Sequence, residues 1–272
     1  MSGRTQKVWP RSPADALAWG RRFEDDGSDN RSLKLVKRKT KNSKPRAAAS
    51  VDPAERFSAG SGVEIVYDQG VPTETSNYTV LLNNIRAAGP DAVIHLGYAP
   101  NDIAFLRNVQ DSGTRFKFLF SIYPGLETEL LEKNVGTKGL NYVYTYVPSS
   151  ELAYEVNAGM PLKDFKEAWH KAYGNTQVEF GFNSVAGYTT GIVLEKALAA
   201  ADSLDQLELR RAMMSLSGKL KTLDGTFELD ATGAQIGENT PIGQMVDDNG
   251  TLGFVTVWPK AVATGKPVYP RP

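Results

Sequence analysis

The sequence predicts an α/β fold, and its length, its apolar content and an alternation of strand and helix patterns lead to that prediction. The chain has 272 residues, of which 41% are hydrophobic. That is enough for one large or two small domains with a real core. Beyond residue 60, short apolar runs alternate with amphipathic segments. Strand–helix–strand order of this kind produces a parallel sheet covered by helices.

The elements between residues 62 and 147 follow from local patterns. Residues 62–68 alternate apolar and β-branched with polar side chains, which is typical of a strand. Ser76-Asn77 can cap a helix that Gly89-Pro90 ends. Short apolar runs, as in 91–98, are typical of strands buried on both faces. The remaining predictions here are a helix over 100–112 and strands over 116–123 and 140–147.

The second half of the chain has a different pattern of residues, with longer helical segments. Phe165, Trp169 and Tyr173 recur every four residues and predict one face of a helix that Gly174 closes. Further helices are expected over 184–201, which is rich in alanine, and 205–216. The sequence Asp-Asp-Asn-Gly at 247–250 lies between apolar runs and predicts a β-hairpin.

The net charge of zero is the sum of two unlike parts. Residues 1–50 hold 13 basic and 5 acidic side chains, a net of +8; the totals of 31 and 31 leave 18 and 26 for the rest, a net of −8. Residues 34–46 are mostly Lys, Arg, Ser, Asn and Pro, and such a run is expected to be disordered. It could be an arm that contacts nucleic acid, but a solvated extension is the interpretation we favour. We do not expect nucleic acid as a partner.

Candidate chemistry is sparse, so we expect no enzyme, no cofactor and no metal site. There is no cysteine, and His95 and His170 are the two histidines. His95 lies inside an apolar strand, where a core histidine with a satisfied partner is the commoner case. Ser121 lacks the glycine-flanked elbow that exposes a nucleophile. We name no catalytic residue.

Polar aromatic residues follow the predicted parallel strands. Tyr98, Tyr123, Tyr144 and Tyr146 lie at or near strand ends, and Ser121 stands beside Tyr123. Ligands of parallel α/β sheets bind beyond the carboxyl ends of the strands. Tyrosine suits a small ligand with an apolar part and a few polar atoms. Tyrosines that merely cover the sheet edge are an equally open interpretation.

The order of several segments resembles a known family. The segments that carry the resemblance are Asn77-Tyr78-Thr79-Val80-Leu81-Leu82-Asn83-Asn84-Ile85-Arg86-Ala87-Ala88-Gly89-Pro90-Asp91-Ala92-Val93, Gly97-Tyr98, Gly187-Tyr188, Asp224-Gly225-Thr226-Phe227-Glu228-Leu229-Asp230 and Val257-Trp258-Pro259. Over about residues 59–259 the chain resembles the second half of a type I periplasmic solute-binding protein, from the leucine/isoleucine/valine-binding group of ABC transporters. The resemblance implies two Rossmann-like lobes, a ligand held in the cleft between them and closure by a hinge.

The resemblance also implies ligand-binding residues. Tyr98 matches the ligand-contacting tyrosine of the family's Gly-Tyr turn. Ser121, Ile122 and Tyr123 match the turn in which amino-acid binders place an acid against the ligand's ammonium group. No acid stands in that turn, and the nearest is Glu127. Phe182 and Asn183 match a cleft segment of the first lobe. An amino acid or a related small organic acid or amide is therefore the implied ligand, and an ABC permease the implied partner.

The resemblance implies an incomplete first lobe. We expect residues 1–58 to be a basic, disordered extension, 59–178 to be a nearly complete second lobe, and 179–272 to hold the returning segments of the first lobe and the C-terminal strands. The chain then resembles a family member truncated by roughly its first third, whose helices expose apolar faces. The family is periplasmic, yet residues 14–19 are too short and too polar for a signal peptide, which as written indicates a cytoplasmic product.

Three alternatives remain open from the sequence. The same lobe could serve an intracellular ligand sensor or interaction protein whose basic arm contacts nucleic acid, or it could be a degenerate fragment that binds nothing. An α/β enzyme would need Ser121 or His95 to take part in turnover.

Overall fold

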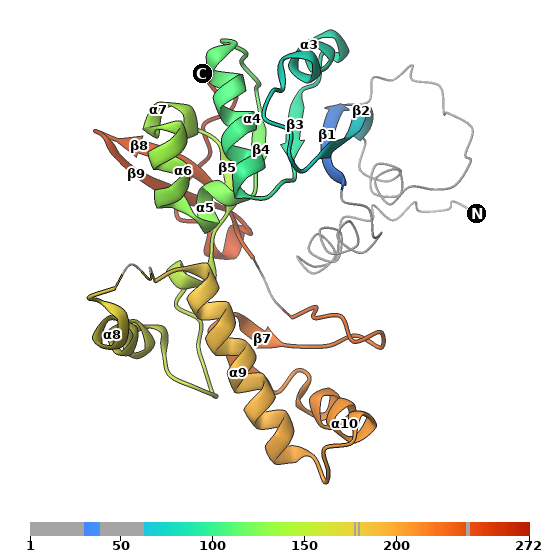
Figure 1. The fold of residues 1–272 in the computed structure, drawn as a ribbon, viewed down its shortest axis with the longest axis vertical. Helices are drawn as coiled ribbons and strands as arrows, with labels where there is room; N and C mark the ends of the chain where they lie inside the picture. Colours follow the sequence, from blue (N-terminus) through green and yellow to red (C-terminus); the bar gives the residue numbers. More distant parts are fainter. Residues whose placement is uncertain (1–29, 39–62, 177, 179, 238–239) are drawn as a thin grey trace, which may run out of the picture. The chain divides into compact units, whose positions relative to one another are not determined.

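The computed structural model describes residues 30–38 and 63–272, apart from 177, 179 and 238–239 (Figure 1). The described chain divides into two compact units. The first holds residues 30–38, 63–146 and Ile242–Pro272, and the second holds Val147–Pro241. The chain thus passes between units after Tyr146 and after Pro241, whereas the change of lobe that we predicted at residue 178 falls inside the second unit.

The first unit is built on a seven-stranded sheet. Its strand order is β2-β1-β3-β4-β5-β8-β9. The strands are β1 (Asn30–Arg38), β2 (Val63–Pro72), β3 (Ala92–His95), β4 (Leu119–Ser121), β5 (Tyr144–Tyr146), β8 (Ile242–Asp248) and β9 (Thr251–Trp258). The central strands β3, β4 and β5 are parallel, and the outer strands pair antiparallel. The α/β class is confirmed, with a mixed sheet around the predicted parallel centre.

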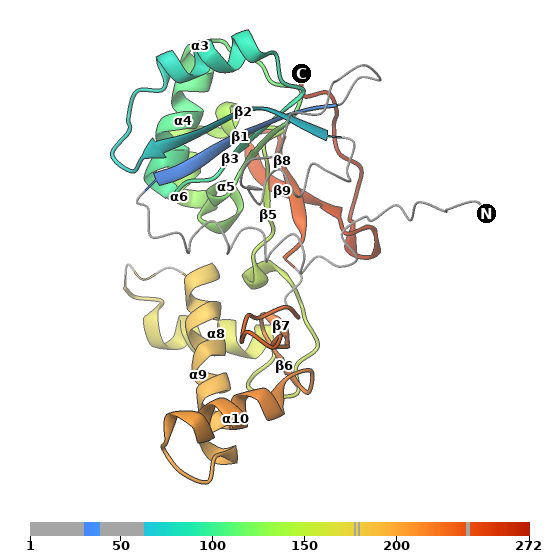
Figure 2. The ribbon, with the colours of Figure 1, turned by 90° about the vertical axis from the view of Figure 1, so that its right-hand side faces the viewer.

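Strand β1 lies within residues 1–58, for which we predicted a disordered extension, and it differs from that prediction over Asn30–Arg38. Figure 2 shows β1 between β2 and β3, and it pairs antiparallel with both of them. Its sequence Ser32-Leu33-Lys34-Leu35 alternates polar and apolar residues, a strand pattern that the high basic charge concealed. The other residues of 1–58 lie outside the described chain.

Within the described residues of the first unit, five helices accompany this sheet. They are α3 (Thr79–Ala88), α4 (Ala99–Asp111), α5 (Tyr123–Leu126), α6 (Thr128–Val135) and α7 (Thr137–Leu140). Helix α3 begins and ends where predicted: Asn77 Oδ1 accepts the Thr79 N–H at 2.9 Å, and Gly89 closes the helix with φ 57°. Helix α4 packs against α6 and α7. The core between helices and strands includes Leu82, Ile85, Phe105, Leu106, Leu119 and Leu131.

The C-terminal hairpin also follows its local sequence. Strands β8 and β9 are joined at Asn249-Gly250, whose φ values of 54° and 91° are both positive, as a type I′ turn requires. Tyr144 pairs with Gln244, so the hairpin adds to the far side of the parallel strands. The single turn η2 (Lys260–Val262) follows it.

The second unit is mainly helical. It contains η1 (Ser149–Glu151), α8 (Leu162–Tyr173), α9 (Phe182–Ala200), α10 (Gln206–Leu216), β6 (Leu220–Thr222) and β7 (Gly225–Phe227). Its small core holds Phe165, Val185 and Leu223. Within α9, Val185 and Ala197 are buried, whereas Leu194 and Leu198 are 47% and 42% exposed. An apolar helix therefore shows much of its surface in this unit, in line with the expectation of exposed apolar faces.

Candidate functional site

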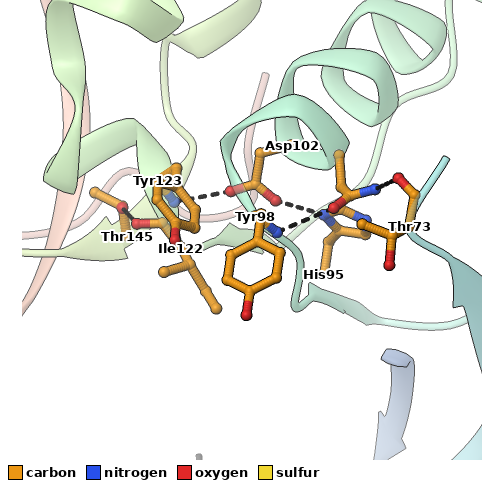
Figure 3. A network of polar contacts seen from close by, with 8 residues as sticks. Thr73, His95, Tyr98, Asp102, Ile122, Tyr123 and Thr145 are labelled. Carbon is orange, nitrogen blue, oxygen red and sulfur yellow. Dashed lines mark hydrogen bonds and ion pairs between the residues drawn. The ribbon is translucent and has the colours of Figure 1, made fainter. Parts of the chain in front are cut away.

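The candidate site lies where the parallel strands of the first unit end. His95 of β3 is in register with Ser121 of β4, so both strands stop at the same level. Tyr98 precedes α4, and Tyr123 is the first residue of α5. Their rings lie edge to face with centroids 6.4 Å apart, and the Tyr98 side chain is 44% exposed. The structure therefore brings together two of the residues that the sequence predicted (Figure 3).

The turn that carries Ile122 and Tyr123 is held from two sides. The Tyr123 N–H donates to Asp102 Oδ2 at 2.8 Å. On the other side the buried Thr145 hydroxyl donates to the Ile122 carbonyl at 2.8 Å and accepts the Gly125 N–H at 2.9 Å. Figure 3 shows the contact of Asp102 with Tyr123 on one side of the turn and that of Thr145 with Ile122 on the other. The turn is thereby tied to α4 and to β5 at once.

The segment that carries Tyr98 is held by Asn101. The Asn101 Oδ1 accepts the Tyr98 N–H at 3.2 Å, and its Nδ2 donates to the Thr73 carbonyl at 2.7 Å. Asn101 itself is 2% exposed. The first turn of α4 therefore fixes Tyr98 just as it fixes Tyr123.

His95 and Asp102 form a buried pair beneath these two turns. His95 Nδ1 lies 2.7 Å from Asp102 Oδ1, and the residues are 1% and 0% exposed. The imidazole stacks on Phe105 at 4.3 Å between ring centroids, and the Tyr78 ring meets its edge. The interpretation of His95 as a core histidine with a partner agrees with this geometry. Sequence reasoning missed Asp102, although an acid in the first turn of a predicted helix is a usable signal.

Ser121 lies in the sheet and not on its surface. Its side chain is completely buried, and no described residue forms a hydrogen bond with its hydroxyl. Ile122 and Tyr123, the next two residues, are half-buried. An unpaired buried hydroxyl costs about 1–3 kcal/mol. The predicted group Ser121, Ile122 and Tyr123 is therefore one turn whose first residue faces inward.

Acidic groups at this edge are few. The carboxylate nearest the turn is that of Asp102, and its two oxygens are occupied by His95 and the Tyr123 N–H. Glu127 follows α5 and is half-buried. The residues at the strand ends thus offer aromatic rings, hydroxyls and backbone groups, with no acid in the predicted turn.

Phe182 and Asn183 belong to the second unit. They are the first two residues of α9. Asn183 is exposed, and it contributes to a pocket of about 420 Å³ between α8 and α9. Other residues of that pocket are Met160, Phe165, Trp169, Tyr173, Ser184 and Tyr188. In this unit, Asn183 therefore borders an aromatic pocket that the sequence did not predict.

Tyr78 provides a test of how well this region excludes water. Its side chain is 1% exposed, and burial raises its pKa from the ordinary value of 10.0 to about 12. Below pH 10 the phenol is protonated in both the folded and the unfolded chain, so its contribution to stability is fully present. Between pH 10 and 12 only the unfolded chain loses the proton, and stability falls.

We expect Tyr78→Phe to reduce this alkaline loss of stability. The variant also removes a buried hydroxyl. Urea unfolding of the wild type and the variant, followed from pH 9 to 12, measures the effect. Equal losses of unfolding free energy in both proteins would contradict it.

Among the described residues, no three His, Cys, Asp or Glu side chains lie together so as to hold a metal ion. In the same part of the chain, no helix has the length and apolar content needed to cross a membrane.

A family model described as periplasmic binding protein matches residues 40–251. The chain belongs to this family. Membership confirms the expected resemblance. The Leu/Ile/Val-binding protein homolog 7 of Brucella suis biovar 1 (strain 1330) is 24% identical over 248 residues, which are 90% of this chain and 60% of the relative. The homolog 7 of Brucella abortus (strain 2308) is 24% identical over 80% of this chain and 53% of the relative.

Solved structures of the family share the fold. The LivJ substrate-binding protein of Streptococcus pneumoniae, solved with isoleucine, aligns with a TM-score of 0.53 at 15% identity over 75% of this chain and 56% of its own. An amino-acid ABC transporter substrate-binding protein from Pseudomonas fluorescens Pf-5 aligns with a TM-score of 0.55 at 18% identity over 79% and 58%. The chain therefore spans little more than half the length of the proteins it matches.

Proposed function

We propose that this chain binds a small solute as part of the substrate-binding component of an ABC-type importer, in the periplasm. The proposed ligand is an amino acid or a related small organic acid or amide. Family membership supports the binding role, and the Leu/Ile/Val-binding relatives support the ligand class. An ABC permease is the proposed partner, since similar proteins are named as ABC transporter components.

The observation that carries the proposal is the pair of Tyr98 and Tyr123 at the ends of adjacent parallel strands. Their rings are 6.4 Å apart, and their backbone N–H groups donate to Asn101 and Asp102. Aromatic faces bind the apolar part of a small ligand, while hydroxyls and nearby backbone groups bind its polar atoms. We propose that Tyr98, Ile122 and Tyr123 contact the ligand and that Ser121 supports them from within the sheet.

The chemistry of the predicted turn narrows the ligand class. An α-ammonium group requires an anionic or strongly accepting partner, since an unpaired charge is costly to desolvate. No acid stands at 121–123, and Asp102 is buried with both oxygens in use. Organic acids and amides with an apolar or aromatic part therefore fit this turn better than free amino acids.

Isothermal titration with a panel of L-leucine, L-isoleucine, L-phenylalanine, phenylacetate and phenylacetamide tests this function. We expect one or more of these to bind, and Tyr98→Ala to weaken binding at least about tenfold, or 1.4 kcal/mol. Tyr269→Ala is the matched control, because Tyr269 is similarly exposed in the same unit. Absence of heat from every compound, or equal affinity of the wild type and Tyr98→Ala, would overturn the proposal.

Phe182 and Asn183 remain proposed ligand contacts from the second unit. Their support is the resemblance and the pocket that Asn183 borders. Asn183→Ala belongs in the same titration, and unchanged affinity would remove this residue from the proposed contacts.

A further inference from the structure

We propose that His95 and Asp102 are positioning residues for ligand recognition, which fix the separation of Tyr98 and Tyr123. This inference rests on the proposed function, because it assigns a role to the groups beneath the ligand-contacting rings. Neither residue reaches the surface, since their exposures are 1% and 0%.

Asp102 joins three elements through one carboxylate. Its backbone belongs to α4, its Oδ1 meets His95 at the end of β3, and its Oδ2 accepts the Tyr123 N–H at the start of α5. Figure 3 shows the carboxylate between the imidazole and the Tyr123 turn. Hydrogen bonds to a charged acceptor are shorter and stronger than neutral ones, so this bridge is stiff.

The neighbouring residue Asn101 extends the same bridge to Tyr98. It accepts the Tyr98 N–H, so successive residues of one helical turn hold the backbone of both tyrosines. The connection between His95 and Tyr98 has little free space: a Cβ atom on Gly97 would lie 2.7 Å from the Asn101 Cβ and 3.0 Å from the His95 Cε1. A shift of the His95 ring would therefore press on the segment that ends at Tyr98.

The His95–Asp102 pair contributes little to stability, but it fixes the positions of the groups that it contacts. Burying ionisable groups costs desolvation energy that their mutual attraction only partly offsets, and apolar residues of equal volume often stabilise a core as well. Apolar residues could not bind the Tyr123 N–H, however. The stacking of His95 on Phe105 sets the ring plane, and Asp102 then transmits that position to the Tyr123 turn.

Amide hydrogen exchange tests the positioning without any ligand. The Tyr123 amide should exchange at least about tenfold faster in Asp102→Ala than in the wild type, because its acceptor is gone. Asp102→Asn keeps an acceptor oxygen and should restore part of the protection. Val109→Ala is the control, since Val109 is a buried apolar residue of the same helix. If Asp102→Ala fails to fold, the Tyr123 exchange rates of the wild type, Asp102→Asn and Val109→Ala are compared instead. Tyr123 exchange that is no faster in Asp102→Asn than in Val109→Ala would overturn the proposal.

Titration with L-isoleucine and phenylacetate then tests recognition. At a temperature where every variant is folded, Asp102→Ala should bind at least about tenfold more weakly than Val109→Ala, with Asp102→Asn between them. Equal affinities of Asp102→Ala and Val109→Ala would overturn the role in recognition. Failure of the wild type to bind any compound of the wider panel overturns the proposed function instead, and the exchange of the Tyr123 amide still decides whether the pair holds the turn.

Discussion

Phe105→Ala is expected to lower the free energy of unfolding of the first unit by about 3–5 kcal/mol, the usual cost of truncating a buried aromatic side chain. Phe105 is 0% exposed and lies in the core beside Leu106. Its ring stacks on His95 at 4.3 Å and meets the Tyr78 ring edge at 5.4 Å. Alanine would leave a cavity bordered by a histidine whose orientation depends on that stacking.

Urea-dependent hydrogen exchange of peptides from β3 and β4 measures this effect in the first unit alone. Val80→Ala is the control, because Val80 is 74% exposed on α3 and its truncation should cost less than about 0.5 kcal/mol. A loss below 1 kcal/mol for Phe105→Ala would mean that the core closes around the deletion. The same variant should also weaken protection of the Tyr123 amide, because the His95 ring loses its support.

Elements with complete local signals could be predicted from the sequence. Helix α3 has a capping asparagine, an apolar face and a terminal glycine, and it forms as expected. The hairpin of β8 and β9 follows from Asn249-Gly250, which accept the positive φ values of the turn. In these cases the information lies within a few neighbouring residues, so no knowledge of distant contacts is needed.

Features that depend on distant partners could not be predicted in this way. Strand β1 pairs with β2 and β3, and its alternation is hidden in a run of basic charge. The predicted strand over 116–123 shortens to Leu119–Ser121, because the chain turns into α5 at Tyr123. Residues Ile242–Pro272 return to the first unit. This return depends on tertiary contacts that the local sequence pattern does not reveal.

Some features of the candidate site could likewise be predicted from the sequence, and others could not. The sequence places Tyr98 and Tyr123 at the ends of predicted parallel strands, where ligands of such sheets bind, and their rings lie 6.4 Å apart. The inward direction of Ser121 and the bridge through Asp102 depend on the pairing of β3 with β4 and on the docking of α4. Of the residues named from the sequence, Tyr98 is exposed, Tyr123 is half-buried and Ser121 faces inward. The supporting residue Asp102 was not among them.

Gly125→Ala is expected to destabilise the first unit by at least about 1–3 kcal/mol, the usual cost of overpacking. A Cβ atom at this position would lie 1.9 Å from the Tyr146 carbonyl oxygen and 2.9 Å from the Thr145 Cγ2. The obstructing oxygen belongs to the backbone of β5 and cannot rotate away, so α5 itself must move. That movement would break the hydrogen bonds of Thr145 to Gly125 and Ile122, which hold the Tyr123 turn.

Two measurements separate this close approach from a general intolerance of the sheet to substitution. Gly253→Ala is the matched control, because Gly253 lies in β9 of the same sheet and a Cβ atom there would meet nothing within 4 Å. Urea unfolding should show a large loss for Gly125→Ala and little change for Gly253→Ala. Titration with the panel ligand that the wild type binds should show weaker binding by Gly125→Ala alone, because the displaced turn carries Tyr123 away from Tyr98. If Gly125→Ala were as stable as the wild type and bound the ligand equally well, α5 could shift without disturbing the turn. The docking of α5 on β5 would then have no part in placing the two rings.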